Sequence, residues 1–514
     1  MPAPQTVVVG AGLGGLTAGA LLLKAGHRIT VLEAHVYPGG CAGTFYHKKF
    51  RFDAGATLAG GFAPGGPHAQ VAEKLGLEWP IHPVDPAWIV HLPDGRSVTQ
   101  WTDPQQWQAE RQAAFPDTES FWQRLEMLAD IAWDVSSRPF PWPPESLHDI
   151  YTLARAVRPK TLHTLPYLHR MISSLMPPDN PLFRAFVDAQ LLISAQTTSE
   201  QANALYGSAA LDLPRRGVNH VKGGIGALAD TLVNWIRQHG GEVLFRQKVT
   251  EIEMQNGRAK AICTNKGLYL EADNILANLT PWALRDLLGK NAPAKLAREV
   301  RQRQATWGAF TLYLGIESAR LPTKTAGHHQ IIVDAERPLG EGNSVFVSIS
   351  DSNDSTRAPT GQQAVTLSTH TAVAPWWQLR HNDKAAYHAR REAYAERLLA
   401  AAETALPGLR NAITLCLPGT PVTFEFFTRR PSGMVGGFPQ KSILQARGPS
   451  TSIENIWLVG DSIFPGQSTA GVTLGGMRVA NLVERISRAG RPLRLWQPNV
   501  STNNLYGGPN GNVF

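Results

Sequence analysis

Apolar positions near the start of the chain form two short runs separated by a longer segment of small residues. Thr6 to Val9 is apolar and β-branched, as in a buried strand. Leu16 to Ala25 has the small and aliphatic composition of a helix packed on a sheet, and Arg28 to Leu32 is again strand-like. The glycines Gly10, Gly12 and Gly15 follow the first strand in G-x-G-x-x-G order. This pattern predicts a βαβ unit that binds a dinucleotide.

The glycine spacing has a physical reason at each position. Gly10 permits the tight turn, Gly12 lets a pyrophosphate approach the backbone, and Gly15 lets helix and strand pack closely. The helix N-terminus supplies free N–H groups and partial positive charge for the diphosphate. Glu33, at the end of the second strand, is placed to bind a ribose hydroxyl. An acid there favours FAD or NAD over NADP, and the fingerprint alone does not separate the first two.

Two further stretches are rich in glycine and predict ligand contacts. In "YPGGCAGTFYHKKFRFDAGATLAG", the glycines Gly39, Gly40 and Gly43 form a backbone-rich loop before an alternating strand. Near the C-terminus, a buried strand from Ile456 to Val459 ends in Gly460 and Asp461, and a glycine-bearing loop leads into a long helix. An acid there can bind a ribityl or ribose hydroxyl, and elongated FAD needs such a second element whereas nicotinamide does not. We therefore predict FAD.

Glycine-loop βα patterning alternates along the chain with segments rich in Trp and Pro. Gly217 to Phe245 has a glycine loop, an amphipathic helix and a strand, and the next three short segments predict a β-meander. The fold class is therefore α/β: a Rossmann-like FAD-binding domain with an interleaved α+β substrate domain. We assign residues 1–75, 215–300 and 430–490 to the first, 76–214 and 301–429 to the second, and 491–514 to a flexible tail.

Composition narrows the class of protein. A chain of 514 residues with 43% hydrophobic and 18% charged residues is globular and large enough for more than one domain. No run reaches the length of an uncharged membrane span. Because the first strand begins near residue 6, we expect no signal peptide and a cytoplasmic location. The three cysteines have no C-x-x-C spacing, so we expect reduced thiols and no metal site.

Positive charge gathers in one segment. Tyr151 to Pro178 contains no acid but has Arg155, Arg158, Lys160 and Arg170 among aliphatic and aromatic residues. This mixture suits an anionic lipid surface, while an ordinary helical face with solvated arginines explains it equally well. No nucleic-acid-binding module is visible, so we expect no nucleic acid as a partner. If the substrate is a lipid, we expect this segment to dock on the membrane and frame the substrate entrance.

Taken together, the motifs resemble the FAD-dependent carotenoid desaturase and isomerase family, within the amine-oxidase-like flavoproteins. The resemblance covers nearly the whole chain and includes "PGGCAGTF", "FDAGAT", "VKGGIGALADTLV" and "LVGDSIFPGQSTAGVTLGGMRVANLV". The stretch "GGFAPGGPHAQVAEKLGLEWP" is most similar to cyanobacterial-type carotenoid 3′,4′-desaturases. The sequence departs from the family at Cys41 and Ala42, where many members have an arginine or serine.

The resemblance implies a set of cofactor contacts, which in this chain are Gly10, Gly12, Gly15, Glu33, Gly39, Gly40, Gly460 and Asp461. It also points to Gly55, Pro465 and Thr473, each of which has an equally simple structural explanation. Val249 lies on the strand that in these flavoproteins gives adenine a backbone contact, and it fits a plain core valine as well. No catalytic base can be named.

The implied reaction is desaturation of a carotenoid, with hydride transfer from an allylic C–H to flavin N5. The protein must then position the chain, exclude water and accept a proton. The alternatives are a carotenoid cis–trans isomerase and, from another class, a non-enzymatic lipid or prenyl-protein escort on the same fold. As partners we expect a carotenoid, a peripheral membrane surface, and oxygen or a quinone as electron acceptor.

Overall fold

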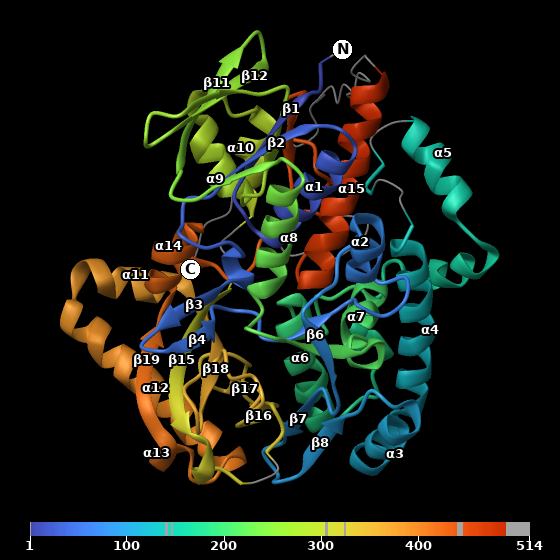
Figure 1. Cartoon of the computed structure of the whole chain (residues 1–514). Coiled ribbons are helices and arrows are strands. Elements are labelled where there is room, and N and C mark those ends of the chain that lie inside the picture. The colour runs from blue at the N-terminus through green and yellow to red at the C-terminus, as the bar shows by residue number, and fades with distance from the viewer. Residues whose placement is uncertain are drawn as a thin grey trace, which may run out of the picture.

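The structure is a computed structural model that describes residues 2–138, 142–144, 147–303, 307–322, 325–438 and 446–489. The predicted flexible tail, 491–514, lies outside these ranges. Two large sheets organise the described chain, one in the upper and one in the lower half of Figure 1.

The upper sheet is the nucleotide-binding type that the N-terminal pattern predicts. Its strand order is β10-β2-β1-β14-β20, and every pair is parallel. The strands are β1 (Gln5–Val9), β2 (Arg28–Leu32), β10 (Glu242–Leu244), β14 (Asn274–Ala277) and β20 (Ile456–Leu458). Three distant parts of the chain thus supply one sheet, and the carboxyl ends of β1, β14 and β20 lie side by side.

Helices α1 (Leu13–Lys24), α8 (Ala227–Gln238) and α15 (Thr469–Ala489) pack beside this sheet (Figure 1). The first helix begins at Leu13, so the predicted start at Leu16 is wrong. Gly14 and Gly15 belong to the first turn of α1, where this helix packs against α15. A Cβ on Gly476 of α15 would lie 2.5 Å from the carbonyl oxygen of Gly14, so glycine is needed for this close approach.

A small antiparallel sheet flanks the nucleotide-binding sheet, as the predicted meander requires. Its order is β11-β12-β13. The elements of this region are β11 (Val249–Gln255), β12 (Arg258–Thr264), β13 (Tyr269–Glu271), α9 (Pro281–Leu288) and α10 (Ala294–Gln302).

The lower sheet has seven strands in the order β19-β15-β18-β17-β16-β7-β8, antiparallel except for the β16–β7 pair. Its strands are β7 (Trp88–His91), β8 (Ser97–Gln100), β15 (Trp307–Glu317), β16 (His328–Ile332), β17 (Ser344–Ile349), β18 (Gln362–Ala372) and β19 (Ile413–Gly419). All of them come from the two segments assigned to the substrate domain. The boundaries of that division stay a prediction.

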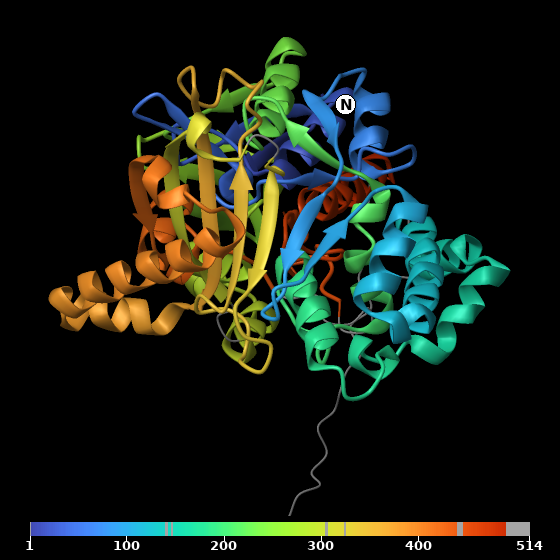
Figure 2. The ribbon, with the colours of Figure 1, turned by 90° about the horizontal axis from the view of Figure 1, so that it is seen from below.

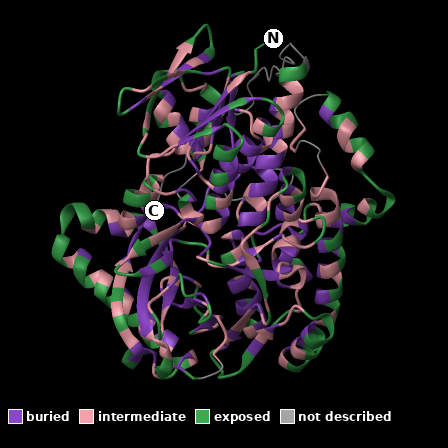
Figure 3. Cartoon of the chain, viewed as in Figure 1, coloured by how far each residue is buried: buried purple, intermediate pink, exposed green. Residues whose placement is uncertain are grey.

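Helices lie on both sides of the lower sheet (Figure 2). On one side, in orange, are α11 (Val373–Asn382), α12 (Lys384–Ala405), α13 (Leu409–Ala412) and α14 (Pro421–Thr428). On the other, in blue-green, are α3 (Pro104–Ala114), α4 (Glu119–Ser136), α5 (Leu147–Ala156), α6 (Pro181–Ala195) and α7 (Ala204–Leu211). Trp107 and Trp122 are buried in the core of the second group. Figure 3 shows that buried positions concentrate in the sheets and around α1 and α15, whereas α5 is largely exposed.

Short elements connect the two halves. The hairpin β3 (Thr44–His47) and β4 (Phe50–Asp53) follows the second glycine loop, whose 3-10 turn η1 spans Gly40–Ala42. Helix α2 (Pro67–Leu75) packs against α15. A three-stranded sheet has the order β5-β9-β6, with β5 (Ala59–Gly60), β6 (Ile81–Val84) and β9 (Val218–Val221). Among the described helices, none combines the length and apolar character needed to cross a bilayer.

Candidate flavin site

The first glycine loop joins β1 to α1 and holds Glu33 at its side. Gly10 has φ of +95°, which favours glycine, and its N–H donates to the carbonyl oxygen of Leu32 at 2.8 Å. The Glu33 carboxylate accepts from the backbone N–H of Ala11 at 2.7 Å and of His35 at 2.8 Å. Burial raises the pKa of Glu33, against the lowering effect of these backbone N–H groups. Each carboxylate oxygen retains a second lone pair that can accept from a ribose hydroxyl.

Asn278 lies between the first glycine loop and the C-terminal one. It follows β14, the strand between β1 and β20, and its Nδ2 donates to the carbonyl oxygen of Gly10 at 3.3 Å. A Cβ on Gly12 would lie 2.4 Å from this Nδ2, and one on Gly460 would lie 3.0 Å from Oδ1. A Cβ on Gly15 would lie 2.8 Å from the Cβ of Asn278. Three of the predicted glycines therefore make room for one asparagine side chain.

The second glycine loop packs directly on the first. Gly12 and Gly39 form a parallel β-bridge, and the Gly39 N–H donates to the carbonyl oxygen of Ala11 at 2.9 Å. Gly39 and Gly40 both have positive φ, +107° and +59°. Gly55 packs closely against this loop: a Cβ there would lie 2.8 Å from the carbonyl oxygen of Cys41. The two loops form one glycine-lined cradle of backbone groups.

A partly buried ion pair closes the cradle on its C-terminal side. Arg430 follows α14, and its Nη1 lies 2.9 Å from Oδ2 of Asp461, with the two side chains 15% and 18% exposed. Burial opposes the charge on Arg430, but Asp461, and after it Cys41, hold the pKa of Arg430 above its ordinary value. Burial raises the pKa of the Cys41 thiol although Arg430 lowers it, so Cys41 is neutral near pH 7.

These loops line one cavity of about 1430 Å³. Nine of the predicted cofactor contacts line this cavity: Gly10, Gly12, Glu33, Gly39, Gly40, Gly55, Val249, Gly460 and Asp461. Gly15, Pro465 and Thr473 are not among its lining residues: Gly15 faces Asn278, and Thr473 is fully buried in α15. The cavity exceeds the roughly 300–1,000 Å³ of a pocket for one drug-sized ligand, so it offers room for a cofactor and a substrate together.

The far part of the cavity differs in chemistry from the cradle. The lining residues on β7, α6, α7 and β15 to β18 include no Asp, Glu, Lys or Arg within the described ranges. Trp88, Ile193, Leu211 and Phe346 supply apolar surface there. Burial lowers the pKa of the lining residue His370 to about 4, so its imidazole is uncharged at neutral pH.

The side-chain amides of Gln190 and Gln330 in this part of the wall form hydrogen bonds within the protein. Trp88 donates its indole N–H to Gln190 Oε1 at 2.8 Å, and Gln190 donates to Gln330. Gln330 in turn donates to the carbonyl oxygen of Ala189 at 3.0 Å. Such a wall presents neutral surface to its contents.

The donors of the cradle fit a phosphate-bearing flavin dinucleotide. Nε and Nη2 of Arg430 are buried and have no hydrogen-bond acceptor within the described part of the chain, and a buried unsatisfied donor costs about 1–3 kcal/mol. A cofactor with anionic and carbonyl oxygens supplies acceptors, while Glu33 and Asp461 offer acceptors to its hydroxyl groups. Gly12 and the first turn of α1 present backbone N–H groups for a diphosphate.

Comparison with known proteins agrees with this geometry. Residues 13–483 match the family model described as flavin containing amine oxidoreductase.

The chain belongs to this flavoprotein family.

Curated relatives narrow the likeness within the family. A prolycopene isomerase of Daucus carota is 28% identical over 502 residues, covering 93% of this chain and 80% of the relative. A neurosporene-forming phytoene desaturase of Cereibacter sphaeroides is 24% identical over 524 residues, covering 95% and 96%. An oxidoreductase structure from Methanosarcina mazei matches with a TM-score of 0.63 at 21% identity, covering 93% of this chain and all of that one.

Family membership confirms the predicted fold, the flavin cofactor, here FAD, and the assignment as an oxidoreductase. The predicted resemblance to carotenoid desaturases and isomerases is likewise confirmed by the names of these relatives. The narrower likeness to 3′,4′-desaturases stays a prediction, as do the individual cofactor contacts.

Two residues of the site escaped the sequence analysis. Asn278 lies between β14 and α9 without a motif of its own, although a polar residue at the end of a buried strand is a usable signal. Arg430 follows α14 outside any quoted motif, and only the tertiary fold brings it to Asp461.

The basic segment from Tyr151 to Pro178 lies apart from this cavity. None of its residues is among the residues that line the cavity, so the structure does not support the expectation that it frames the substrate entrance. Arg158 and Lys160 lie 3.2 and 3.1 Å from the carboxylate oxygens of Asp134 on α4, which draws both cations toward the protein.

Proposed function

We propose that this protein is an FAD-dependent desaturase of a carotenoid. The observation that carries the proposal is the cavity wall beyond the flavin cradle, where the described residues of β7, α6, α7 and β15 to β18 place no charged side chain. A long polyene hydrocarbon offers no partner to a charge, and burying one without a partner is costly. The names of the relatives support the same class of substrate.

The residues of the chain have separate tasks in this reaction. Bound FAD would supply a hydride acceptor at N5 for an allylic C–H of the substrate, where the polyene can delocalise developing positive charge. Glu33, Asp461 and the glycine cradle hold the cofactor by its hydroxyl and diphosphate groups. The apolar side chains of Trp88, Ile193 and Phe346 position the hydrocarbon and exclude water. Desaturation also requires a proton to pass from the neighbouring carbon to water or a base, and oxygen or a quinone would take two electrons and two protons in regenerating the oxidised cofactor.

A cis–trans isomerase is the second candidate. It is favoured by the relatives named prolycopene isomerase, whose 28% identity exceeds the 24% of the neurosporene-forming desaturase. The same cradle and apolar wall serve both reactions, which differ in whether the flavin is reduced in each turnover. The non-enzymatic escort has no such support, because the family is one of oxidoreductases.

Product analysis tests the function. Purified holoprotein is incubated with a panel of carotenes in liposomes, and the products are separated and weighed by mass spectrometry. A desaturase yields products lighter by two hydrogens per bond, with absorption at longer wavelength. An isomerase yields products of unchanged mass and altered retention. Complete recovery of every carotene unchanged, from protein with full flavin content, would contradict both candidates.

We further propose that α5 and the 3-10 helix η3 (Pro159–Tyr167) dock on a membrane surface. Large apolar side chains are exposed there: Leu147 (86%), Ile150 (54%), Tyr151 (58%), Val157 (42%), Leu162 (56%) and Leu165 (57%). Arg155 and Arg170 remain available beside them, stacked on Tyr151 and Tyr167 with 5.7 Å from each guanidinium carbon to the ring centre. Apolar side chains that enter the headgroup region and cations that hold them there are what such docking requires.

Co-sedimentation with anionic liposomes tests this surface. The test variant replaces Ile150, Leu162 and Leu165 by Gln, and the control replaces the exposed Tyr269 and Val333, which do not line the flavin cavity, by Gln. We expect the test variant to lose most of its binding and the control to keep it. Replacing Arg155 and Arg170 by Glu is expected to weaken binding at low salt, since each surface cation contributes about 1 kcal/mol. Equal binding of the test variant and wild type would place the membrane contact elsewhere.

A further inference from the structure

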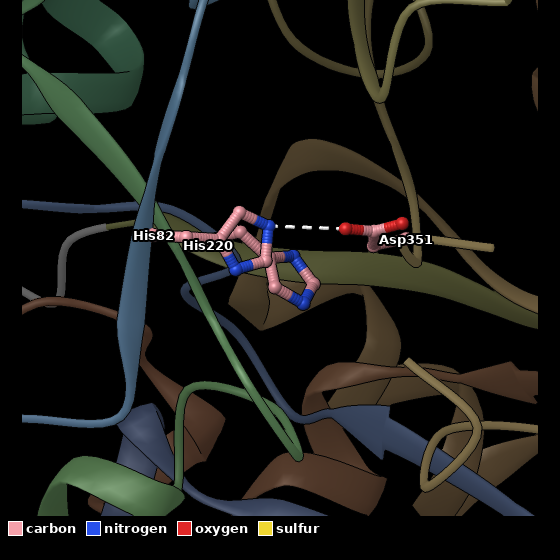
Figure 4. A group of neighbouring side chains, drawn as sticks. All are labelled: His82, His220 and Asp351. Atoms are coloured by element: carbon pink, nitrogen blue, oxygen red, sulfur yellow. Dashed lines mark hydrogen bonds and ion pairs between the residues drawn. The ribbon is translucent and has the colours of Figure 1, made fainter. Parts of the chain in front are cut away.

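Two histidines and an aspartate meet outside the flavin cavity. His82 on β6 and His220 on β9 are directly opposite each other in an antiparallel pair. Asp351 reaches them from the loop between β17 and β18. Figure 4 shows the two imidazoles beside each other on neighbouring strands, with the carboxylate of Asp351 on their open side.

The three side chains are close enough to share one ion. One ligand atom from each lies within 4.8 Å of the other two. Nε2 of His82 is 3.0 Å from Oδ2 of Asp351, and the two imidazole centres are 4.7 Å apart. A tetrahedral ion with ligands at about 2.0–2.1 Å needs ligand atoms about 3.3 Å apart. Where the ligand atoms are farther apart than this, up to 4.8 Å, the 47% exposed side chain of His82 has room to move toward the other two.

A second carboxylate orients the buried histidine. Asp354 Oδ2 lies 3.4 Å from Nε2 of His220 and accepts the backbone N–H of Gly223 at 2.7 Å. Its other oxygen accepts from the hydroxyl of Thr356 at 2.5 Å. A carboxylate that holds one nitrogen of a ligating histidine, leaving the other for the metal, is the usual outer-shell arrangement of metal sites. Here Asp354 leaves Nδ1 of His220 to face a cation.

We propose that His82, His220 and Asp351 bind a divalent transition-metal cation, with Zn²⁺ as the fitting example. Imidazole and carboxylate ligands suit Zn²⁺, and three protein ligands leave a position for water. Binding displaces the proton shared between His82 and Asp351, as ligation by deprotonated groups requires. The nearby Arg357 opposes a cation only weakly, because its guanidinium is paired with Asp53 at 3.0 Å.

Such an ion would tie together parts of the chain that converge only in the folded protein. It would join the β6–β9 ribbon to the β17–β18 loop of the lower sheet. Val218, at the start of β9, lines the flavin cavity, so the site lies two residues from the cavity wall on the same strand. The expectation of no metal site rested on the spacing of the three cysteines, and His82, His220 and Asp351 come from separate segments without a ligand motif.

Metal titration tests the site. Holoprotein stripped with EDTA is titrated with Zn²⁺ in competition with a chromophoric chelator, and Co²⁺ is added separately to record its ligand-field absorption. We expect one Zn²⁺ per chain. We expect His82→Ala and Asp351→Asn each to weaken binding at least about 10-fold, and Asp354→Asn to weaken it by about 10–100-fold. The Co²⁺ bands should disappear in His82→Ala.

The matched control is His148→Ala, which removes another exposed histidine, on α5, far along the chain from the cluster. It should bind Zn²⁺ as wild type does. His82 and Asp351 are both partly exposed, so their variants are expected to fold and keep flavin, which is checked by absorbance. Wild type without stoichiometric Zn²⁺, or unchanged affinity in either His82→Ala or Asp351→Asn, would overturn the proposal.

Discussion

The close contacts around Asn278 lead to a prediction that separates packing from cofactor binding. Gly12→Ala would place a Cβ 2.4 Å from Nδ2 of Asn278, nearer than heavy atoms approach. Overpacking of this kind costs about 1–3 kcal/mol. Gly12 itself has φ of −74°, so backbone strain adds nothing. The clash is therefore with the side-chain amide of Asn278, and removing that amide should relieve it.

Asn278→Ala alone should cost about 0.5–1.5 kcal/mol, because it removes the hydrogen bond from Nδ2 to Gly10. In the double variant Gly12→Ala/Asn278→Ala, the loss in free energy of unfolding should be close to that of Asn278→Ala alone. It should be well below the sum of the losses in the two single variants. Gly15→Ala is the matched control: its Cβ would lie 2.8 Å from the Cβ of Asn278, which alanine retains. Adding Asn278→Ala to Gly15→Ala should therefore not restore the free energy of unfolding that Gly15→Ala loses.

The assay is urea unfolding of flavin-free protein, with the midpoint and slope recorded for each variant, together with the flavin content of the purified holoproteins. We expect the double variant to regain stability while its flavin content stays low, because Gly12 lines the cavity and the added methyl group takes up space in the cradle. Additive losses in Gly12→Ala/Asn278→Ala would refute the packing argument. Equal rescue of Gly15→Ala would show that Asn278 acts through something other than this contact.

Two predictions concern the charged groups of the cradle. Arg430→Met should destabilise the protein by about 1–3 kcal/mol, since it leaves the partly buried Asp461 carboxylate without its partner; adding Asp461→Asn should restore much of the urea midpoint without restoring tight FAD binding. Burial raises the folded pKa of Glu33, so its contribution to the stability of flavin-free protein is full below the ordinary value of 4.5 and is lost as pH rises through the folded pKa. Glu33→Gln should remove that slope from the pH dependence of unfolding, and an unchanged slope would exclude Glu33 as its source.

Local spacing predicts the first glycine loop because part of its bonding lies within one βαβ unit. The N–H of Gly10 donates to Leu32, and the carboxylate of Glu33 accepts from Ala11. The start of α1 was placed too late because Gly14 looks like part of a loop. Its place in the helix depends on contact with Gly476, far along the chain.

Residues whose roles depend on sheet order or distant pairing could not be predicted. Asn278 acts because β14 lies between β1 and β20, an order that no local pattern encodes. Arg430 acts because α14 ends beside Asp461. The place of the basic segment at the entrance stays a prediction, and its pairing could not be foreseen either: Asp134, on a helix outside the segment, pairs with Arg158 and Lys160.

Desaturation of a carotene in the far part of the cavity is tested by a single turnover without oxygen. Holoprotein is mixed anaerobically with a carotene in liposomes, and flavin absorbance and product mass are followed together. We expect the oxidised flavin band to bleach by one equivalent for each double bond formed, with a product lighter by two hydrogens. Conversion of the carotene to a product of unchanged mass, with the flavin oxidised at the end, would contradict it.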